Sequence, residues 1–190
     1  VSEIERMLDS IDLSHPQGHR NHAIIETLYA SGLRVSELVN LRKTDLFEEL
    51  KLIRVIGKNN KERLVPIGSS ALKSIGLYAD HYRRHITAKK GEEDILFLNR
   101  RGKRLTRVMI FTIVKNIAKD AEIDKKVSPH TFRHSFATHL VEGGADLRAV
   151  QDLLGHESIT TTEIYSHIDR EYIRNTLKLY HPGSDFKDDD

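Results

Sequence analysis

Apolar residues recur with helical spacing through most of this chain. In residues 19–32, Ile24, Ile25 and Leu28 fall on one side of a helix, and Gly32 follows as a residue type that commonly ends one. Asp146 and Gly155 bracket a second clear helix as its N-cap and its stop. The same pattern predicts further helices, some of them short, over residues 2–11, 35–41, 68–84, 106–123, 130–140, 158–168 and 169–180.

Two stretches differ from this helical pattern. Residues 50–67 place two β-rich runs on either side of the turn Gly57–Asn60, which predicts a β-hairpin. The segment DILFLN, residues 94–99, predicts one more brief strand. The helix expected over 106–123 is strongly apolar, so we expect it to lie in the core. The predicted fold class is therefore mainly α with a small antiparallel β-sheet, an α+β arrangement.

Composition narrows the class of protein. With 190 residues the chain is long enough for one well-packed domain, and its 38% apolar and 31% charged residues indicate a globular protein. No apolar run approaches the roughly 18 residues of a membrane span, and the start lacks the layout of a signal peptide. The absence of an initiator Met suggests a piece of a longer protein. The absence of cysteine excludes disulfides and a cysteine nucleophile, and fits a cytoplasmic location.

The net charge of +2 conceals local basic clusters. The acidic end DFKDDD holds four of the 28 acidic residues and one of the 30 basic ones, and without it 29 basic and 24 acidic residues leave +5. The segment RRGKRLTR contains five basic residues and no acidic one, and residues 51–63 are also basic. Such clusters suit a phosphate backbone, although solvated turns would have the same composition. The candidates for contact with a DNA backbone are Arg100, Arg101, Lys103, Arg104 and Arg107.

The stretch SPHTFRHSFATHL, residues 128–140, concentrates three histidines and an arginine on one predicted helix. His130 and His134 have the spacing of zinc ligands, but no glutamate lies between them as in H-E-x-x-H, and Arg133 beside them would repel a cation. Arg133 also falls within the apolar arc of this helix, so we expect a carboxylate or a phosphate to meet it. This favours an anion site over a metal site, with His134 and His139 in support through packing and hydrogen bonding.

Residues with matching chemistry occur elsewhere in the chain. Arg34 lies at the junction of two predicted helices, Lys58 at the tip of the hairpin, and His156 just after the helix stop at Gly155, with Tyr165 nine residues on. Two guanidiniums can bind the oxygens of one phosphate, and a tyrosine can act as a nucleophile. Because the pKa of a tyrosine is about 10, it needs a base to accept its proton or a strong positive field. A lysine or histidine could protonate the leaving oxygen, and the arginines would supply the charge stabilisation without a metal.

Each of these residues has an ordinary explanation when taken alone. A lone tyrosine such as Tyr165 more often belongs to a core or an interface, and Lys58 alone would be a solvated turn lysine. Arg34 alone would most simply pair with Glu37. Their joint occurrence is what indicates an active site.

The set resembles the tyrosine recombinase (phage integrase) family, most closely its bacterial Xer site-specific recombinases. The stretches that carry the resemblance are YASGLRVSELVNL, VIGKNNKERLVPI and the block from Ser128 to Ile168. The family order of Arg, Lys, His-x-x-Arg, His and Tyr is filled by Arg34, Lys58, His130, Arg133, His156 and Tyr165. The resemblance extends over residues 1–181, which implies one tyrosine recombinase catalytic domain followed by an acidic, disordered tail at 182–190.

The resemblance implies a role for each residue. Tyr165 would attack the scissile phosphodiester and form a 3′-phosphotyrosyl link, while Lys58 protonates the departing 5′-oxygen. The other expected roles are charge stabilisation by Arg34 and Arg133, a hydrogen bond to a phosphate oxygen from His156, and orientation of His130 by Glu37. His130 is the candidate base for Tyr165, with bulk water as the alternative. No cofactor and no metal is expected.

The resemblance also implies partners and a cellular role. The expected partners are double-stranded DNA, other protomers in a synaptic tetramer linked through the helix 169–180, and a DNA translocase, with no membrane. The expected place is the cytoplasm, in association with the nucleoid, where the enzyme would act in chromosome dimer resolution during partition and cell division, or in DNA integration and excision. The last helix could instead pack on its own domain, and an N-terminal DNA-clamping domain usual in the family is absent from this chain.

Three other functions remain open. A type IB topoisomerase-like enzyme would share the chemistry but relax supercoils as a monomer, and a telomere resolvase would make hairpin ends. A non-catalytic DNA-binding protein belongs to a different class, and the complete set of six residues argues against it.

Overall fold

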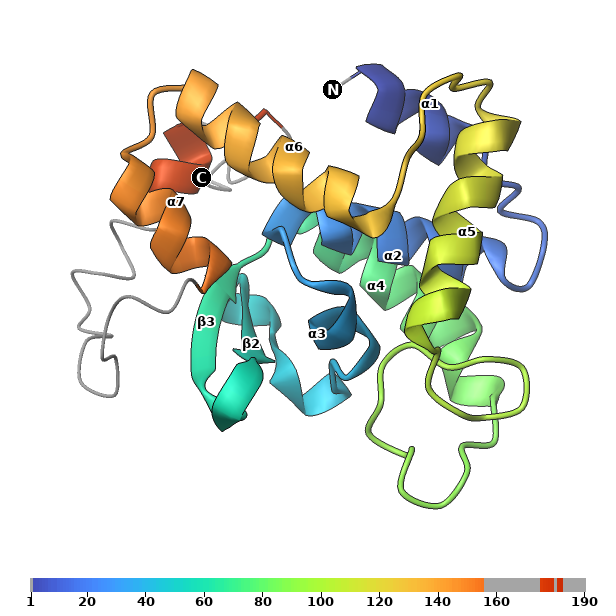
Figure 1. Ribbon diagram of the computed structural model, residues 1–190. Coiled ribbons are helices and arrows are strands. Elements are labelled where there is room, and N and C mark those ends of the chain that lie inside the picture. The colour runs from blue at the N-terminus through green and yellow to red at the C-terminus, as the bar shows by residue number, and fades with distance from the viewer. Residues whose placement is uncertain (1, 156–174, 180, 183–190) are drawn as a thin grey trace.

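The computed structural model of the protein describes residues 2–155, 175–179 and 181–182. In these residues the fold is mainly helical with one small antiparallel sheet, as predicted (Figure 1). The α-helices are α1 (Ser2–Asp9), α2 (Gly18–Ser31), α3 (Val35–Val39), α4 (Ser69–His81), α5 (Arg107–Asp120), α6 (Pro129–Glu142) and α7 (Leu147–Leu154). Short 3₁₀ turns occur at η1 (Lys43–Asp45), η2 (Glu48–Leu50), η3 (Lys58–Asn60) and η4 (Arg83–His85).

The main core is built around α2. This helix lies between α4 and α6 in Figure 1, and its Ile24, Ile25 and Leu28 are completely buried, as the sequence predicted. Gly32 ends the helix in the left-handed conformation, with φ of 59°. The turn that follows brings α3 back across the same core, so that Arg34 begins α3 close to the end of α2.

The predicted hairpin forms and gains a third strand. Strands β2 (Leu52–Ile56) and β3 (Glu62–Pro66) pair antiparallel with Val55 opposite Arg63. The two-residue strand β1 (Leu46–Phe47) adds to the other edge of β2, which the sequence did not predict. The turn η3 between β2 and β3 carries Lys58.

The prediction of a strand over residues 94–99 is wrong. The structure has only isolated bridges there, from Ile95 to Arg42 and from Leu98 to Arg104. Four consecutive residues, 95–98, are nonetheless buried. Side chains satisfy part of this buried backbone, because Arg83 donates to the Ile95 carbonyl at 3.1 Å and Tyr78 accepts from the Leu98 N–H at 3.2 Å. The apolar run reflects burial of an irregular segment rather than strand pairing.

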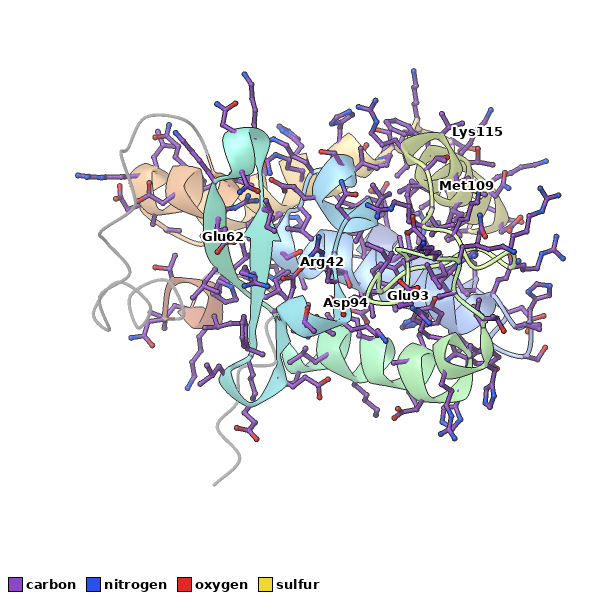
Figure 2. All side chains as sticks on the ribbon, turned by 90° about the horizontal axis from the view of Figure 1, so that it is seen from below. Arg42, Glu62, Glu93, Asp94, Met109 and Lys115 are labelled. Atoms are coloured by element: carbon purple, nitrogen blue, oxygen red, sulfur yellow. The ribbon has the colours of Figure 1, made fainter. Side chains whose placement is uncertain are left out.

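The helix α5, which the sequence predicted to lie in the core, is partly buried. Ile110, Val114, Ile117 and Ala118 of α5 are buried, whereas Val108 is 74% exposed and Met109 and Phe111 are also exposed. Figure 2 shows α5 and the hairpin at opposite sides of the molecule. Glu62 of β3 is labelled on one side and Met109 and Lys115 of α5 on the other, with Arg42, Asp94 and Glu93 between them.

A second apolar cluster joins α6, α7 and the end of the described chain. Residues 175–179 are helical, and Leu177 is buried in this cluster. Its other buried members are Phe136, Leu140, Ala145, Val150, Leu153 and Leu154. The described part of the last helix therefore packs on its own chain. None of the helices described here is long and apolar enough to cross a membrane.

Candidate active site

Arg34 is held at the start of α3 by Glu37. The carboxylate of Glu37 accepts a hydrogen bond from the Arg34 backbone N–H at 2.8 Å and from its Nη1 at 3.1 Å. A glutamate three residues into a helix is well placed for the backbone bond, because the first N–H groups of a helix have no partner within it. The Glu37 side chain is 3% exposed and that of Arg34 is 41% exposed. The guanidinium of Arg34 is thus anchored from the buried side and open on the other.

Arg63 of β3 binds the same carboxylate from the opposite side. Its Nη1 and Nη2 donate to the two oxygens of Glu37 at 2.8 and 3.0 Å, and its Nε donates to the carbonyl of Leu153 in α7 at 3.2 Å. Burial by itself raises the pKa of the Glu37 carboxyl, but the hydrogen bonds and charges of Arg63 and then Arg34 outweigh it and hold the pKa below its usual range. Glu37 is therefore ionised at neutral pH.

Arg133 of α6 meets carbonyl oxygens rather than an anion. Its Nη1 donates to the carbonyl of Gly32 and its Nη2 to that of Leu154, both at 2.8 Å. The expected anionic partner of Arg133, a carboxylate or a phosphate, therefore stays a prediction. Burial, followed by the charge of Arg34, lowers the pKa of the Arg133 guanidinium to about 10, which leaves it protonated at neutral pH.

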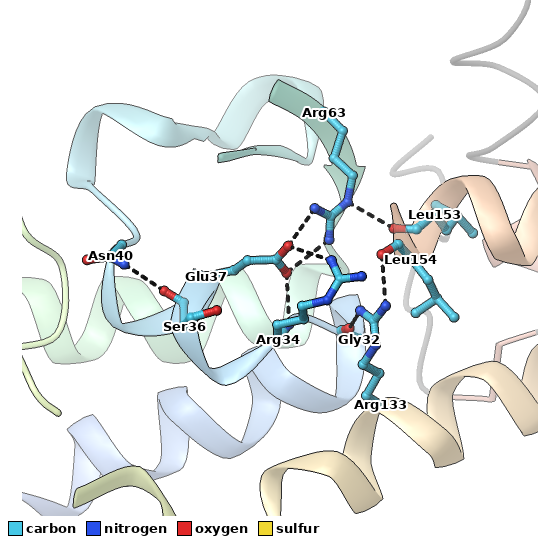
Figure 3. Close-up of polar contacts among 9 residues, drawn as sticks. All are labelled: Gly32, Arg34, Ser36, Glu37, Asn40, Arg63, Arg133, Leu153 and Leu154. Carbon is cyan, nitrogen blue, oxygen red and sulfur yellow. Dashed lines mark hydrogen bonds and ion pairs between the residues drawn. The ribbon is translucent and has the colours of Figure 1, made fainter. Parts of the chain in front are cut away.

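Figure 3 shows Arg34, Arg63 and Arg133 gathered around Glu37 and the end of α7. The three guanidiniums and one carboxylate carry a net charge of +2. The hydrogen bonds of Arg133 within the described residues use two of its five N–H donors, and Arg34 is partly open to solvent. The cluster is a candidate anion site, because fixed N–H donors and excess positive charge lie together.

Lys58 and His130 lie on elements next to this cluster. Lys58 is exposed in the turn η3, at the tip of the hairpin that carries Arg63. His130 is exposed near the start of α6, one turn before Arg133, and its ring stands edge-on to Phe111 of α5 with centroids 5.8 Å apart. The hydrogen bonds of the Glu37 carboxylate described here come from Arg34 and Arg63, and the expected orientation of His130 by Glu37 stays a prediction.

The two other histidines of α6 differ from each other. His139 faces Tyr29 of α2, whose hydroxyl lies 3.4 Å from its Nδ1. The supporting role expected for His139 stays a prediction. Burial lowers the pKa of His139. His134 is exposed on the helix surface. Among the residues that the structure describes, no group of three or more His, Asp or Glu side chains is placed to hold a metal ion.

Two of the six expected catalytic residues, His156 and Tyr165, lie outside the described residues, as does most of the helix expected over 169–180. The structure brings Arg34 and Arg133 into one cluster and places Lys58 and His130 on adjoining elements. For His156 it describes the preceding residue, Gly155, which ends α7 in the left-handed conformation with φ of 68°.

The candidate DNA-backbone residues are of two kinds. Arg100, Arg101, Lys103 and Arg107 are exposed. Arg104 already pairs within the protein, because its Nε lies 2.9 Å from a carboxylate oxygen of Glu92 and its Nη1 donates to Asn40. Four of the five thus have side chains open to a phosphate backbone.

Arg63 is the residue of this cluster that the sequence did not single out. The signal was present, because Arg63 and Val65 occupy alternate positions of a strand and both are buried. A buried arginine on the inward face of a strand requires an acidic or carbonyl partner, and Glu37 is that partner.

Comparison with known proteins gives one consistent result. The sequence model of the Phage integrase family matches residues 1–171. The chain is 46% identical over 182 residues to tyrosine recombinase XerD of Listeria innocua, covering 96% of this chain and 61% of the relative. It is also 46% identical over 185 residues to tyrosine recombinase XerD of Chlorobaculum tepidum, covering 96% and 60%. The chain thus spans about three fifths of the length of these relatives.

Solved structures give the same picture for the fold. The crystal structure of XerA recombinase matches with a TM-score of 0.74 and 32% identity, covering 95% of this chain and 64% of that one. The XerH site-specific recombinase bound to its difH substrate before cleavage matches with a TM-score of 0.71 and 30% identity, covering 82% and 45%.

Proposed function

Because this chain belongs to the phage integrase family, we propose that it acts as the catalytic domain of a tyrosine site-specific recombinase, over residues 1–181. The observation that carries the proposal is the cluster in which Arg34 and Arg133, far apart in sequence, lie together with a net positive charge. The similar XerH recombinase is bound to its difH substrate, and the similar Tn1549 transposon integrase is in complex with circular intermediate DNA, which supports a DNA phosphodiester as the anion.

The proposed chemistry is the one that the family resemblance implies for these residues. The Tyr165 hydroxyl oxygen bonds to phosphorus as the bond to the 5′-oxygen breaks, which leaves a 3′-phosphotyrosyl link and a 5′-hydroxyl. His130 accepts the tyrosine proton and Lys58 protonates the departing oxygen. Arg34 and Arg133 stabilise the charge on the non-bridging oxygens, with a further hydrogen bond from His156. The phosphodiester energy is retained in the intermediate, so a new strand can be joined by the reverse reaction without ATP.

The wider role follows from the resemblance to the XerD recombinases. We place the enzyme in the cytoplasm in association with the nucleoid, acting in chromosome dimer resolution or in DNA integration and excision. Its partners would be duplex DNA, further protomers that engage through residues 169–180, and a DNA translocase.

The test is capture of the covalent intermediate. The chain is incubated with a pool of nicked duplexes of randomised sequence, which needs no knowledge of the target site. Adducts stable to denaturant are recovered, their DNA is sequenced, and the modified residue is found by mass spectrometry. The wild-type chain is expected to give an adduct on Tyr165 and Tyr165→Phe none, because phenylalanine has no hydroxyl to attack phosphorus.

Tyr82→Phe is the matched control, since Tyr82 stacks on His19 away from the arginine cluster. It should trap DNA as the wild type does. An adduct formed by Tyr165→Phe would show that another residue is the nucleophile, and no adduct from the wild type would contradict the proposed function. Relaxation of a supercoiled plasmid without synapsis would favour the topoisomerase-like alternative.

A further inference from the structure

Arg63 forms the base of the arginine cluster and is outside the set of residues expected to act in the reaction. It is 8% exposed, and all three of its hydrogen bonds described above go to groups of the cluster: both oxygens of Glu37 and the carbonyl of Leu153. The bidentate geometry is the strongest arrangement available to an arginine and a carboxylate. Arg63 is thus the principal partner of Glu37, and Arg34 the second.

The charge balance shows what Arg63 does for Arg34. A buried carboxylate needs a cation, because an unpaired charge in the interior is costly. Without Arg63, Glu37 would retain Arg34 as its partner, and the negative charge would offset half of the charge of Arg34 and Arg133. With Arg63 present, the pair Arg63–Glu37 is neutral and the charges of Arg34 and Arg133 remain available to an incoming anion.

We infer that Arg63 is a positioning residue of the cleavage reaction: it neutralises Glu37, so that Arg34 is held by the carboxylate without being neutralised by it. This inference rests on the proposed function, because the anion is taken to be the scissile phosphate. Arg63 does not touch the phosphate in this scheme. It acts through Glu37 on Arg34.

A second contact of Arg63 extends this role to α7. Its bond to the Leu153 carbonyl and the bond from Arg133 to the Leu154 carbonyl place two cations at the C-terminus of α7, where the helix has unpaired carbonyls and a partial negative charge. Gly155 lies against the guanidinium, and a Cβ there would be 3.1 Å from it. Arg63 therefore joins α3, β3 and α7 at the point where the chain leads into His156.

The experiment is a double-mutant cycle on Arg63 and Glu37. Wild type, Arg63→Met, Glu37→Gln and Arg63→Met/Glu37→Gln are compared for the rate of covalent adduct formation on a nicked duplex recovered from the randomised pool. Affinity for the same duplex is measured in a Tyr165→Phe background. Arg63→Met is expected to slow adduct formation on the order of a hundredfold, as for other displaced catalytic groups, with a much smaller loss of affinity.

The double variant separates charge from packing. Removal of the Glu37 charge in the Arg63→Met background restores the cluster's net charge of +2. The double variant should therefore form the adduct at least about tenfold faster than Arg63→Met. If Arg63 served only to pack the core, the double variant would be no faster than Arg63→Met. That result overturns the inference.

Arg54 supplies the matched control. It pairs with the buried carboxylate of Asp45 at 2.8 Å, on the strand next to Arg63. Arg54 lies opposite Leu64 and Arg63 opposite Val55, so the two arginines occupy opposite faces of the sheet. Arg54→Met should leave the adduct rate of the folded protein unchanged. An equal loss of rate in Arg54→Met and Arg63→Met would overturn the inference.

A measurement without DNA distinguishes this inference from the proposed function. The pKa of Glu37 is followed by NMR titration of its carboxyl carbon in the wild type and in Arg63→Met. Loss of Arg63 should raise that pKa, because burial is then opposed by Arg34 alone. Failure of the wild type to form an adduct would contradict the proposed function. An unchanged Glu37 pKa would contradict the role of Arg63, whether or not DNA is cleaved.

Discussion

Gly32 shows how one backbone conformation supports the site. Its φ of 59° lies in the left-handed region, where a residue without Cβ is favoured, and a Cβ there would lie 2.5 Å from the ring of Phe136. Its carbonyl accepts the hydrogen bond from Arg133. The stop of α2, the packing of α6 and the placement of a candidate catalytic arginine therefore depend on the same residue.

We expect Gly32→Ala to lower the free energy of unfolding by more than about 1 kcal/mol, because alanine is strained at this φ and collides with Phe136. Adduct formation should fall as well, since the carbonyl that holds Arg133 would move. Denaturant unfolding and the nicked-duplex assay measure the two effects.

Gly76→Ala is the control for this substitution. Gly76 lies within α4, and a Cβ there would meet nothing within 4 Å. It should stabilise the protein by about 0.5–1 kcal/mol, the usual gain from alanine in a helix interior. Equal stability of Gly32→Ala and the wild type would show that the turn after α2 adapts without cost.

At the scale of elements, α6, α7 and residues 175–179 form one packing unit. The cluster of Phe136, Leu140, Val150, Leu153 and Leu177 joins them, apart from the main core. Arg133 and Arg63 tie the end of α7 to the main body through the carbonyls of Leu154 and Leu153. The position of the C-terminal segment is thus coupled to the arginine cluster through α7.

We expect Leu177→Ala to lower the free energy of unfolding by about 2–5 kcal/mol, because Leu177 is 1% exposed in this cluster. The melting temperature should not vary with protein concentration, since the contacts lie within one chain. Thermal unfolding of dilute and concentrated samples tests both statements.

Leu179→Ala is the control within the same helical turn, because Leu179 is 71% exposed. Its effect should stay within about 0.5 kcal/mol. A melting temperature that rises with concentration in the wild type and not in Leu177→Ala would show instead that Leu177 packs against a neighbouring protomer.

At the scale of the whole molecule, two basic segments project from the same side. In Figure 1 the β2–β3 hairpin and the loop between η4 and α5 both extend from the lower side of the molecule, and α3, which begins after Arg34, lies between them. Under the proposed function, a duplex that follows both segments would pass the arginine cluster. Sequence-independent backbone binding would then be joined to the candidate site of cleavage.

We expect Arg101→Ala/Lys103→Ala to weaken binding to nonspecific duplex DNA and to reduce the slope of log affinity against log salt by about two, at roughly 0.9 per phosphate contact. Both side chains are exposed. Fluorescence anisotropy over a series of salt concentrations gives the slope.

The neutral pair change Arg104→Ala/Glu92→Gln is the control, because Arg104 is already held by Glu92 at 2.9 Å. Its slope should stay close to that of the wild type. A slope unchanged in Arg101→Ala/Lys103→Ala would place the DNA on another face of the molecule.

The sequence by itself determined the local elements and the residue types of the site. Glycines at 32 and 155 end helices in the left-handed conformation, and the turn after Gly57 joins two strands, because these features depend on a few neighbouring residues. The order of the six expected residues is likewise visible in the sequence alone. The family that their resemblance indicated is confirmed.

Only the tertiary structure decided which groups meet. Arg63 and Glu37 are 26 residues apart and Arg133 and Gly32 are 101 apart, so no local pattern joins them. The same cause explains residues 94–99, where partners as distant as Tyr78 and Arg83 satisfy part of a buried backbone that the apolar run predicted to be a strand. Burial of a charged or polar group requires a partner, and the identity of that partner is set by how distant elements pack.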